Sequence, residues 1–164
     1  MDNTYDCNTN TFNNPSTLMA HSFNYVESTL NYMGNYAPFY ATPDSAGIDL
    51  KASKGVIMNP HERVKIPLGI RVAIPKGHVG LLIGRSSMGA KGIAVSNAVG
   101  VIDADYRGEI MALLTNTNNH TVTIMEGDRV AQLLIMPIAQ PKIVCVDSLD
   151  ATTRGEGGFG STGG

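Results

Sequence analysis

Apolar residues occur along most of the chain in short runs that are separated by turn residues such as glycine and proline. In residues 47–52 and 63–66 apolar and polar positions alternate, and this period of two is typical of a half-buried strand. A short helix is predicted for residues 86–91. Strands are predicted at residues 47–52, 63–66, 69–74, 79–83, 93–95, 99–102, 109–115, 121–125, 129–136 and 143–146. Many short strands at roughly ten-residue spacing favour an all-β sandwich, jelly roll or barrel.

The two ends of the chain differ from this β-rich middle. The first 36 residues contain eight Asn, eight Ser or Thr and no Lys or Arg, whereas half of residues 154–163 are glycine. We therefore predict a polar, flexible tail over residues 1–20, one β domain over 21–150 and a glycine-rich arm over 151–164, with one further strand within 23–33. An N-terminus without basic residues lacks the features of a secretory or mitochondrial leader, so an intracellular protein is expected, in the cytoplasm or the nucleus.

Composition and charge narrow the classes of function. The chain has 164 residues, of which 43% are hydrophobic, and this is enough for one domain with a core. A net charge of −2 argues against general nucleic-acid binding, which needs a basic face. No apolar stretch approaches the roughly 18 residues of a membrane-spanning helix, so no membrane partner is expected. Two cysteines and four scattered histidines form neither a disulfide framework nor a zinc-ligand spacing.

Two segments carry side chains that are suited to anions. Arg85, Ser86 and Ser87 follow an apolar run and offer a guanidinium and two hydroxyls, although a polar turn between strands is the simpler explanation of the segment taken alone. The C-terminal arm contains Arg154 and Phe159, which could pair with phosphates and stack on a base, or the arm could simply be disordered. The arm lacks the spacing of a Walker A phosphate-binding loop.

Carboxylates stand in two further segments. Asp103 and Asp105 are two residues apart and share a face if the backbone is extended, and a carboxylate near a phosphate can hold and deprotonate a water. A solvated turn is the alternative. Asp49 lies inside an apolar strand, where a buried carboxylate needs a partner such as an arginine. Gln132 likewise interrupts an apolar run, so interior salt bridges and amide hydrogen bonds are the simplest interpretation of these two residues.

In their order and intervals, these segments resemble the five motifs of the trimeric deoxyuridine triphosphatase (dUTPase) family. The matching stretches are residues 46–50, 85–89, 97–108, 127–134 and 154–163. The resemblance extends from about residue 37 to the C-terminus and does not include residues 1–20.

This resemblance implies hydrolysis of dUTP to dUMP and pyrophosphate by Mg²⁺-assisted attack of water on the α-phosphate. Such a reaction keeps uracil out of DNA and supplies dUMP for dTMP synthesis. By the same resemblance Asp103 is the general base that activates the water, and Asp49 is a supporting carboxylate that orders the site through an arginine. The substrate-binding residues that it implies are Arg85, Ser86, Ser87, Asn97, Gly100, Ile102, Tyr106, Gln132, Arg154, Phe159, Gly160 and Ser161.

The resemblance also implies which part of the nucleotide each residue contacts. It places Arg85, Ser86 and Gln132 along the triphosphate, Asn97 against uracil, and Tyr106 under the deoxyribose, where a 2′-hydroxyl would clash. Arg154, Phe159 and Ser161 belong to the arm that closes over the nucleotide. It further implies a distorted jelly-roll (β-clip) subunit in a homotrimer with active sites shared between subunits. No acidic cluster resembles a metal cage, so Mg²⁺ is expected on the substrate phosphates and waters, with no protein ligand.

Two alternatives remain at this point. Deoxycytidine triphosphate deaminases resemble the same fold and share an Arg-Ser-Ser segment, but Leu113 stands where their catalytic glutamate aligns, and a leucine cannot transfer protons. A non-catalytic trimer that uses the fold as a regulatory or binding module is the other alternative, because one fold can carry many functions.

Overall fold

Short antiparallel strands make up most of the fold in the computed structural model, which describes residues 5–6, 11–12 and 29–158. The prediction of an all-β chain is confirmed, and the described residues contain one short helix, α1 (Ser86–Ala90). The strands are β1 (Tyr5–Asp6), β2 (Thr11–Phe12), β3 (Asn31–Gly34), β4 (Phe39–Tyr40), β5 (Ile48–Lys51), β6 (Val56–Met58), β7 (Arg63–Pro67), β8 (Ile70–Ala73), β9 (His78–Gly84), β10 (Ile93–Val95), β11 (Gly100–Ile102), β12 (Met111–Asn116), β13 (Val122–Ile124) and β14 (Arg129–Pro137).

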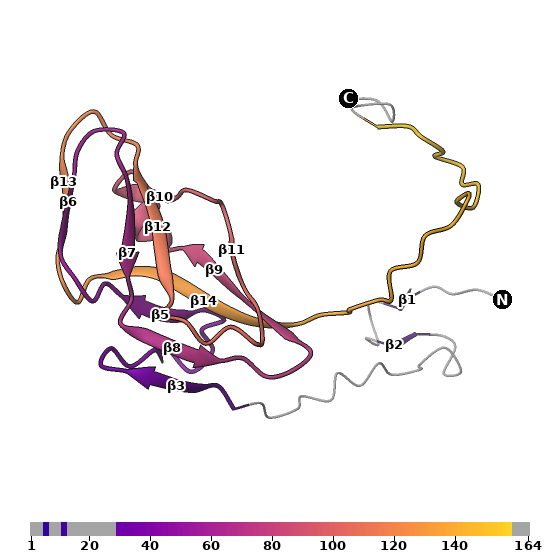
Figure 1. Ribbon diagram of the computed structural model, residues 1–164, viewed down its shortest axis with the longest axis horizontal. Helices are drawn as coiled ribbons and strands as arrows, with labels where there is room; N and C mark the ends of the chain where they lie inside the picture. The colour runs from indigo at the N-terminus through magenta and orange to yellow at the C-terminus, as the bar shows by residue number, and fades with distance from the viewer. Residues whose placement is uncertain (1–4, 7–10, 13–28, 159–164) are drawn as a thin grey trace.

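Two larger sheets and three two-stranded ribbons share these strands. The five-stranded sheet has the order β11-β9-β14-β5-β4, and the three-stranded sheet has the order β10-β12-β7. The ribbons pair β1 with β2, β3 with β8, and β13 with β6. Every pairing is antiparallel, and Figure 1 shows β9, β14 and β5 crossing beneath β7, β10 and β12. The apolar faces of the layers meet in the core between them.

Burial along β12 shows how sequence pattern becomes core. Its positions alternate between half-buried and buried, so that Ala112, Leu114 and Asn116 face inward. Leu50 and Leu133, on two strands of the five-stranded sheet, are buried in the same hydrophobic cluster. Burying an aliphatic side chain of this size stabilises a fold by roughly 1.5–3 kcal/mol, so a cluster of this kind can support a domain.

Strand β14 aligns segments that are far apart in the sequence. It pairs with β5 on one side and β9 on the other, so Gln132 lies opposite both Asp49 and Ile83. A bulge shifts the register between Arg129 and Ala131. The pairing therefore brings three of the predicted motifs to the same region of one sheet.

The predicted strand positions differ from the observed ones in a few places. No strand forms at residues 143–146, where Ile143 is 96% exposed, because this segment pairs with no described strand. The prediction missed β1, β2, β4 and β6, strands of two or three residues that are too short for alternation to be visible. Of the strand expected within 23–33, residues 31–33 belong to β3 and residues 29–30 precede it, whereas residues 23–28 lie outside the described part of the chain.

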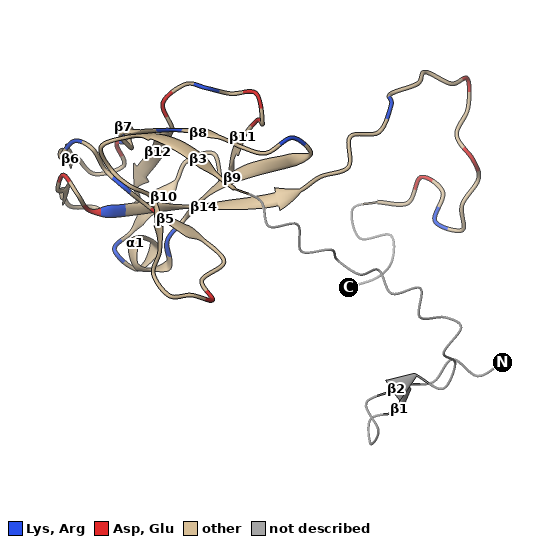
Figure 2. Cartoon of the chain, turned by 90° about the horizontal axis from the view of Figure 1, so that it is seen from below, with Lys and Arg blue, Asp and Glu red and all other residues tan. Residues whose placement is uncertain are grey.

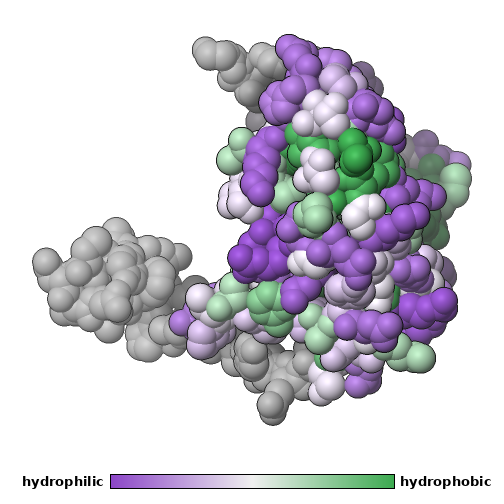
Figure 3. Space-filling view, turned by 90° about the vertical axis from the view of Figure 1, so that its left-hand side faces the viewer, coloured by the Kyte–Doolittle hydropathy of each residue, from purple (hydrophilic) through white to green (hydrophobic). Residues whose placement is uncertain are grey.

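After β14 the chain leaves the two sheets. Residues 138–158 form an extension without strands that points away from the body in two perpendicular views (Figures 1 and 2). Side chains on it are exposed although several are apolar, including Ile143, Val144 and Leu149. At the opposite end of the molecule, Figure 3 shows one apolar area within a mostly hydrophilic surface.

Candidate active site

Asp49 on β5 is the centre of a polar network inside the five-stranded sheet. Its carboxylate is 1% exposed and accepts hydrogen bonds from three side chains. Arg85 Nε donates to Oδ1 at 2.8 Å, Arg129 Nη1 donates to Oδ2 at 3.0 Å, and Gln132 Nε2 donates to Oδ1 at 3.2 Å. A buried carboxylate is tolerated only when charged donors of this kind satisfy it. Asp49 thus fixes the orientation of three polar side chains.

Arg85 lies between β9 and α1, and its own backbone is extended immediately before the helix begins. Its Nη1 donates to Ser87 Oγ at 3.1 Å and to the carbonyl oxygen of Arg129 at 3.2 Å. Met88 is buried and anchors the helix on the body, whereas Ser86 and Ser87 are exposed. The two hydroxyls are therefore available to a ligand beside an arginine that is already oriented.

A pocket of about 240 Å³ opens next to this network. Its lining includes three cationic side chains and the carboxylate of Asp128, and consists of Arg85, Ser87, Met88, Lys91, Asp128 and Arg129. An excess of positive groups in a confined space favours a polyanion. Arg129 and Lys91 were not among the predicted site residues. The signal for Arg129 was its position in the segment 127–134, three residues before Gln132.

A second group of predicted residues lies around β11. Asn97 is in the tight loop between β10 and β11, where Ala98 adopts a φ of +59° and Asn97 Nδ2 donates to the carbonyl oxygen of Val99 at 3.3 Å. Gly100 is buried opposite Leu82, and a Cβ at Gly100 would lie only 3.1 Å from that side chain. Ile102 is half-buried. These residues lie on the loop and on β11, the edge strand of the five-stranded sheet, whose backbone groups can face a flat, polar ring.

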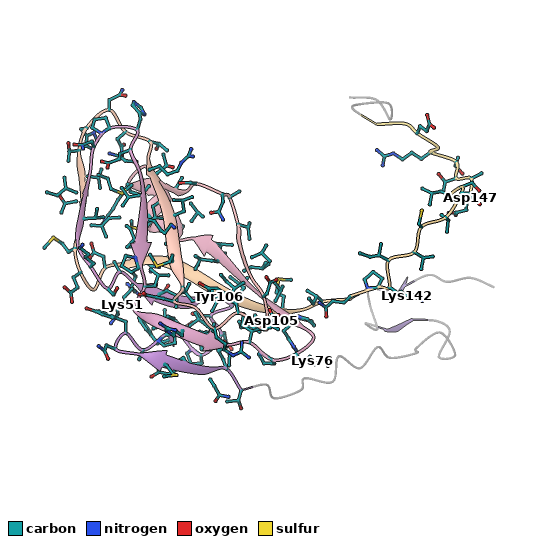
Figure 4. All side chains as sticks on the ribbon, viewed as in Figure 1. Lys51, Lys76, Asp105, Tyr106, Lys142 and Asp147 are labelled. Atoms are coloured by element: carbon teal, nitrogen blue, oxygen red, sulfur yellow. The ribbon has the colours of Figure 1, made fainter. Side chains whose placement is uncertain are left out.

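Asp103 and Tyr106 occupy the loop that follows β11. The carbonyl oxygen of Asp103 accepts the Tyr106 N–H at 3.1 Å, which closes a turn and leaves the Asp103 side chain exposed. Among the described residues no side chain donates to the Asp103 carboxylate, so its oxygens are free to accept from water. Tyr106 is 44% exposed and lies beside Asp105 on this loop (Figure 4).

Within one chain, the Asp49 network and the Asp103 loop do not meet. Strands β9 and β14 lie between β5 and β11. Ile102 is opposite Gly80, five residues before Arg85 on the antiparallel strand β9. Asp103 is one residue further on and corresponds to Val79, so at about 3.3 Å per residue Asp103 and Arg85 are separated by roughly 20 Å along the sheet. The structure thus contains two partial sites, each with part of the predicted chemistry.

The arm residues lie apart from both partial sites. Arg154 is exposed on the extension, and its Nε donates only to the nearby carbonyl oxygen of Gly157, at 2.9 Å. Phe159, Gly160 and Ser161, which the sequence also predicted to bind the nucleotide, lie outside the described residues. Figure 4 shows Lys142 and Asp147 on the same extension, far from Tyr106.

Clusters of metal-ligating side chains and membrane-spanning helices are both absent from the part of the chain that the structure describes. It contains no group of three or more His, Cys, Asp or Glu side chains that could hold a metal ion. None of its helices is both long enough and apolar enough to cross a membrane.

Comparison with known proteins assigns the chain to a family. A family model described as dUTPase matches residues 35–163. A deoxyuridine 5′-triphosphate nucleotidohydrolase from Desulfitobacterium hafniense is 44% identical over 130 residues, which cover 77% of this chain and 86% of the relative. A dUTPase variant of Staphylococcus bacteriophage 80alpha, solved with dUpNHpp, has a TM-score of 0.77 at 27% identity over 83% of this chain and 99% of that one.

A further similar structure was described for the way it coordinates a magnesium ion. A dUTPase mutant from phage phi11 of S. aureus, described for its coordination of a structural Mg(II) ion, has a TM-score of 0.71 at 26% identity over 76% of this chain and 100% of that one. These likenesses confirm the jelly-roll type of fold that the sequence led us to expect. The family model covers most of the chain, and the chain therefore belongs to the dUTPase family.

Proposed function

We propose that this protein hydrolyses dUTP to dUMP and pyrophosphate, and so keeps uracil out of DNA and supplies dUMP for dTMP synthesis. The observation that carries the proposal is the buried Asp49, which orients Arg85, Arg129 and Gln132 beside a cationic pocket in a member of the dUTPase family. A triphosphate is the ligand class that such a pocket fits best.

Asp103 acts in this proposal as the general base. Its carboxylate is exposed and unpaired among the described residues, so it can accept a proton from a water that attacks the α-phosphorus. The P–O bond to the leaving pyrophosphate then breaks, and the water oxygen remains on dUMP.

The phosphates would be held by Arg85, Ser86, Ser87 and Gln132. Their N–H and O–H groups stabilise the negative charge that develops on the leaving pyrophosphate, and because Asp49 holds Arg85 and Gln132 in place, little reorganisation is needed. Arg129 contributes charge to the same pocket.

Uracil would lie against the β10–β11 loop and the edge strand β11. In this proposal Asn97, Gly100 and Ile102 offer amide and backbone groups to the edge of uracil, and Tyr106 packs under the deoxyribose. An amino group in place of the uracil carbonyl would leave mismatched polar groups, at a cost of roughly 1–3 kcal/mol each.

The residues present also fit a magnesium ion that is carried by the substrate. The described residues offer arginine, serine and glutamine donors for phosphates and no acidic cluster. Mg²⁺ commonly binds through phosphate oxygens and waters, and when bound there it neutralises part of the triphosphate charge. We therefore propose Mg²⁺ as the cofactor, without a direct protein ligand.

A homotrimer would unite the partial sites. The Asp103 loop and the Asp49 network lie at different positions on one sheet, so neighbouring copies are needed to bring them to the same nucleotide. The extension carries exposed apolar residues, with Ile143 96% and Leu149 86% exposed, as expected of a segment that packs on another subunit. We propose that Arg154, Phe159, Gly160 and Ser161 reach the site from such a neighbour.

Pyrophosphate release with Mg²⁺ from dUTP, dCTP, dTTP and UTP in parallel tests this function. We expect rapid release from dUTP and, for each mismatched contact, about 10- to 100-fold slower release from the other nucleotides. Chelation of Mg²⁺ is expected to lower the rate. The absence of pyrophosphate from dUTP, with a folded protein, would contradict the proposal, and ammonia from dCTP would identify a deaminase.

A further inference from the structure

The loop after β11 folds the ring of Tyr106 back onto its own backbone. Tyr106 Oη donates to the carbonyl oxygen of Glu109 at 3.1 Å, and the ring lies against Gly108. A Cβ built at Gly108 would lie 2.8 Å from Tyr106 Cε2 and closer still to Cζ and Oη. Because carbon atoms do not pack at such distances, this position of the ring requires that residue 108 has no side chain.

Glycine is not needed at position 108 for the backbone itself. Gly69, Gly77 and Gly92 have φ values of +66°, +79° and +72°, which other residues rarely adopt, but Gly108 is outside this left-handed region. The atoms that a methyl group would meet belong to the outer end of the Tyr106 side chain and not to backbone. An alanine at this position would therefore displace the ring and leave the chain path unchanged.

Glu109 fixes the other end of this arrangement. Its Oε1 accepts the N–H of Gly69 at 3.0 Å, in the turn between β7 and β8. The next residue, Ile110, is fully buried and is hydrogen-bonded through its backbone to Leu68 and Ile70. The carbonyl oxygen that holds Tyr106 is consequently attached to the core, whereas the neighbouring Asp105 and Arg107 are exposed.

We propose that Gly108 and Glu109 are positioning residues that fix the Tyr106 ring and thereby set the preference for deoxyribonucleotides over ribonucleotides. The inference rests on the proposed function, in which Tyr106 lies beside the sugar. A ring can exclude a 2′-hydroxyl only if it cannot move aside, because a displacement of about 1 Å is enough to change turnover substantially. The absence of a side chain at Gly108 allows the Tyr106 ring to lie against the backbone there, and the hydrogen bond to the Glu109 carbonyl oxygen prevents the ring from rotating away.

Gly108→Ala tests the first part of this inference, with Gly55→Ala as its matched control. A Cβ at Gly55 would meet nothing closer than the carbonyl oxygen of Ile124, at 3.4 Å, and its φ is also outside the left-handed region. The measurement is kcat/KM for dUTP and for UTP, with thermal unfolding recorded for both variants. We expect the dUTP-to-UTP ratio to fall about tenfold or more in Gly108→Ala and to stay at the wild-type value in Gly55→Ala.

A pair of substitutions at Glu109 tests whether this residue holds the Tyr106 ring. These variants also test the inference if Gly108→Ala does not fold. Glu109→Gln keeps an oxygen that accepts from Gly69, and Glu109→Leu removes it, at nearly the same size. We expect the ratio to fall in the leucine variant and to be restored in the glutamine variant. If the wild type hydrolyses dUTP but folded Gly108→Ala or Glu109→Leu protein keeps the wild-type dUTP-to-UTP ratio, the inference is overturned and the proposed function stands. No hydrolysis by the wild type would overturn the proposed function with it.

Discussion

Asp103→Asn is expected to lower the turnover of dUTP on the order of 10³-fold while affinity for the nucleotide stays close to wild type. An asparagine amide has nearly the size of the carboxylate but cannot accept the proton of the attacking water. The side chain is exposed and takes no part in the core, so the fold and the contacts to the nucleotide should persist. Steady-state kcat gives the loss, and calorimetric titration with dUpNHpp gives the affinity.

Asp105→Asn is the matched control, because Asp105 is an exposed carboxylate on the same loop, two residues away. It is expected to keep turnover near wild type. Turnover of the Asp103 variant within a few-fold of wild type would remove this residue from the role of base.

Asp49→Ala is expected to lower the free energy of unfolding by about 3–5 kcal/mol. Without the carboxylate, the Arg85 side chain, only 17% exposed, loses its charged partner, and Gln132 and Arg129 lose an acceptor. The same loss should weaken dUTP hydrolysis, since Arg85 and Gln132 would no longer be held. Urea unfolding measures the first effect and kcat/KM the second.

Asp44→Ala provides the comparison, because Asp44 is an exposed carboxylate shortly before β5. Its free energy of unfolding should stay within about 0.5 kcal/mol of the wild type. If Asp49→Ala were equally harmless, the network around Asp49 would not be the organising feature of the site.

Much of the fold could be predicted because strand pattern is local information. The alternation in residues 47–52 and the apolar run at 129–136 each correspond to observed strands, β5 and β14. The segment 143–146 shows where this reasoning fails. Its apolar residues have the composition of a strand, but a strand needs a neighbour to pair with, and no described strand lies beside this segment.

The site was harder to predict than the fold. A carboxylate within an apolar strand indicated a charged partner for Asp49, and Arg85 is that partner in the structure. Arg129 escaped prediction because an arginine at the start of a strand is usually a solvated residue, and only the register of β5 against β14 brings it to Asp49. The role of Gly108 depends on the orientation of the Tyr106 ring, which no sequence pattern contains.

We propose that a single dUTP site combines Asp103 of one chain with Arg85 of another. Co-expression of Asp103→Asn and Arg85→Ala chains with different tags, followed by purification on both tags, tests it directly. In the Arg85→Ala variant the Asp49 carboxylate still accepts hydrogen bonds from Arg129 and Gln132, so this variant is expected to fold. In a closed trimer that contains both variants, about one site in three has an intact Asp103 and an intact Arg85. We therefore predict that the mixed trimers release pyrophosphate at about one third of the wild-type rate. Each variant alone should be nearly inactive. Mixed assemblies as inactive as their parents would show that Asp103 and Arg85 do not share a site between chains.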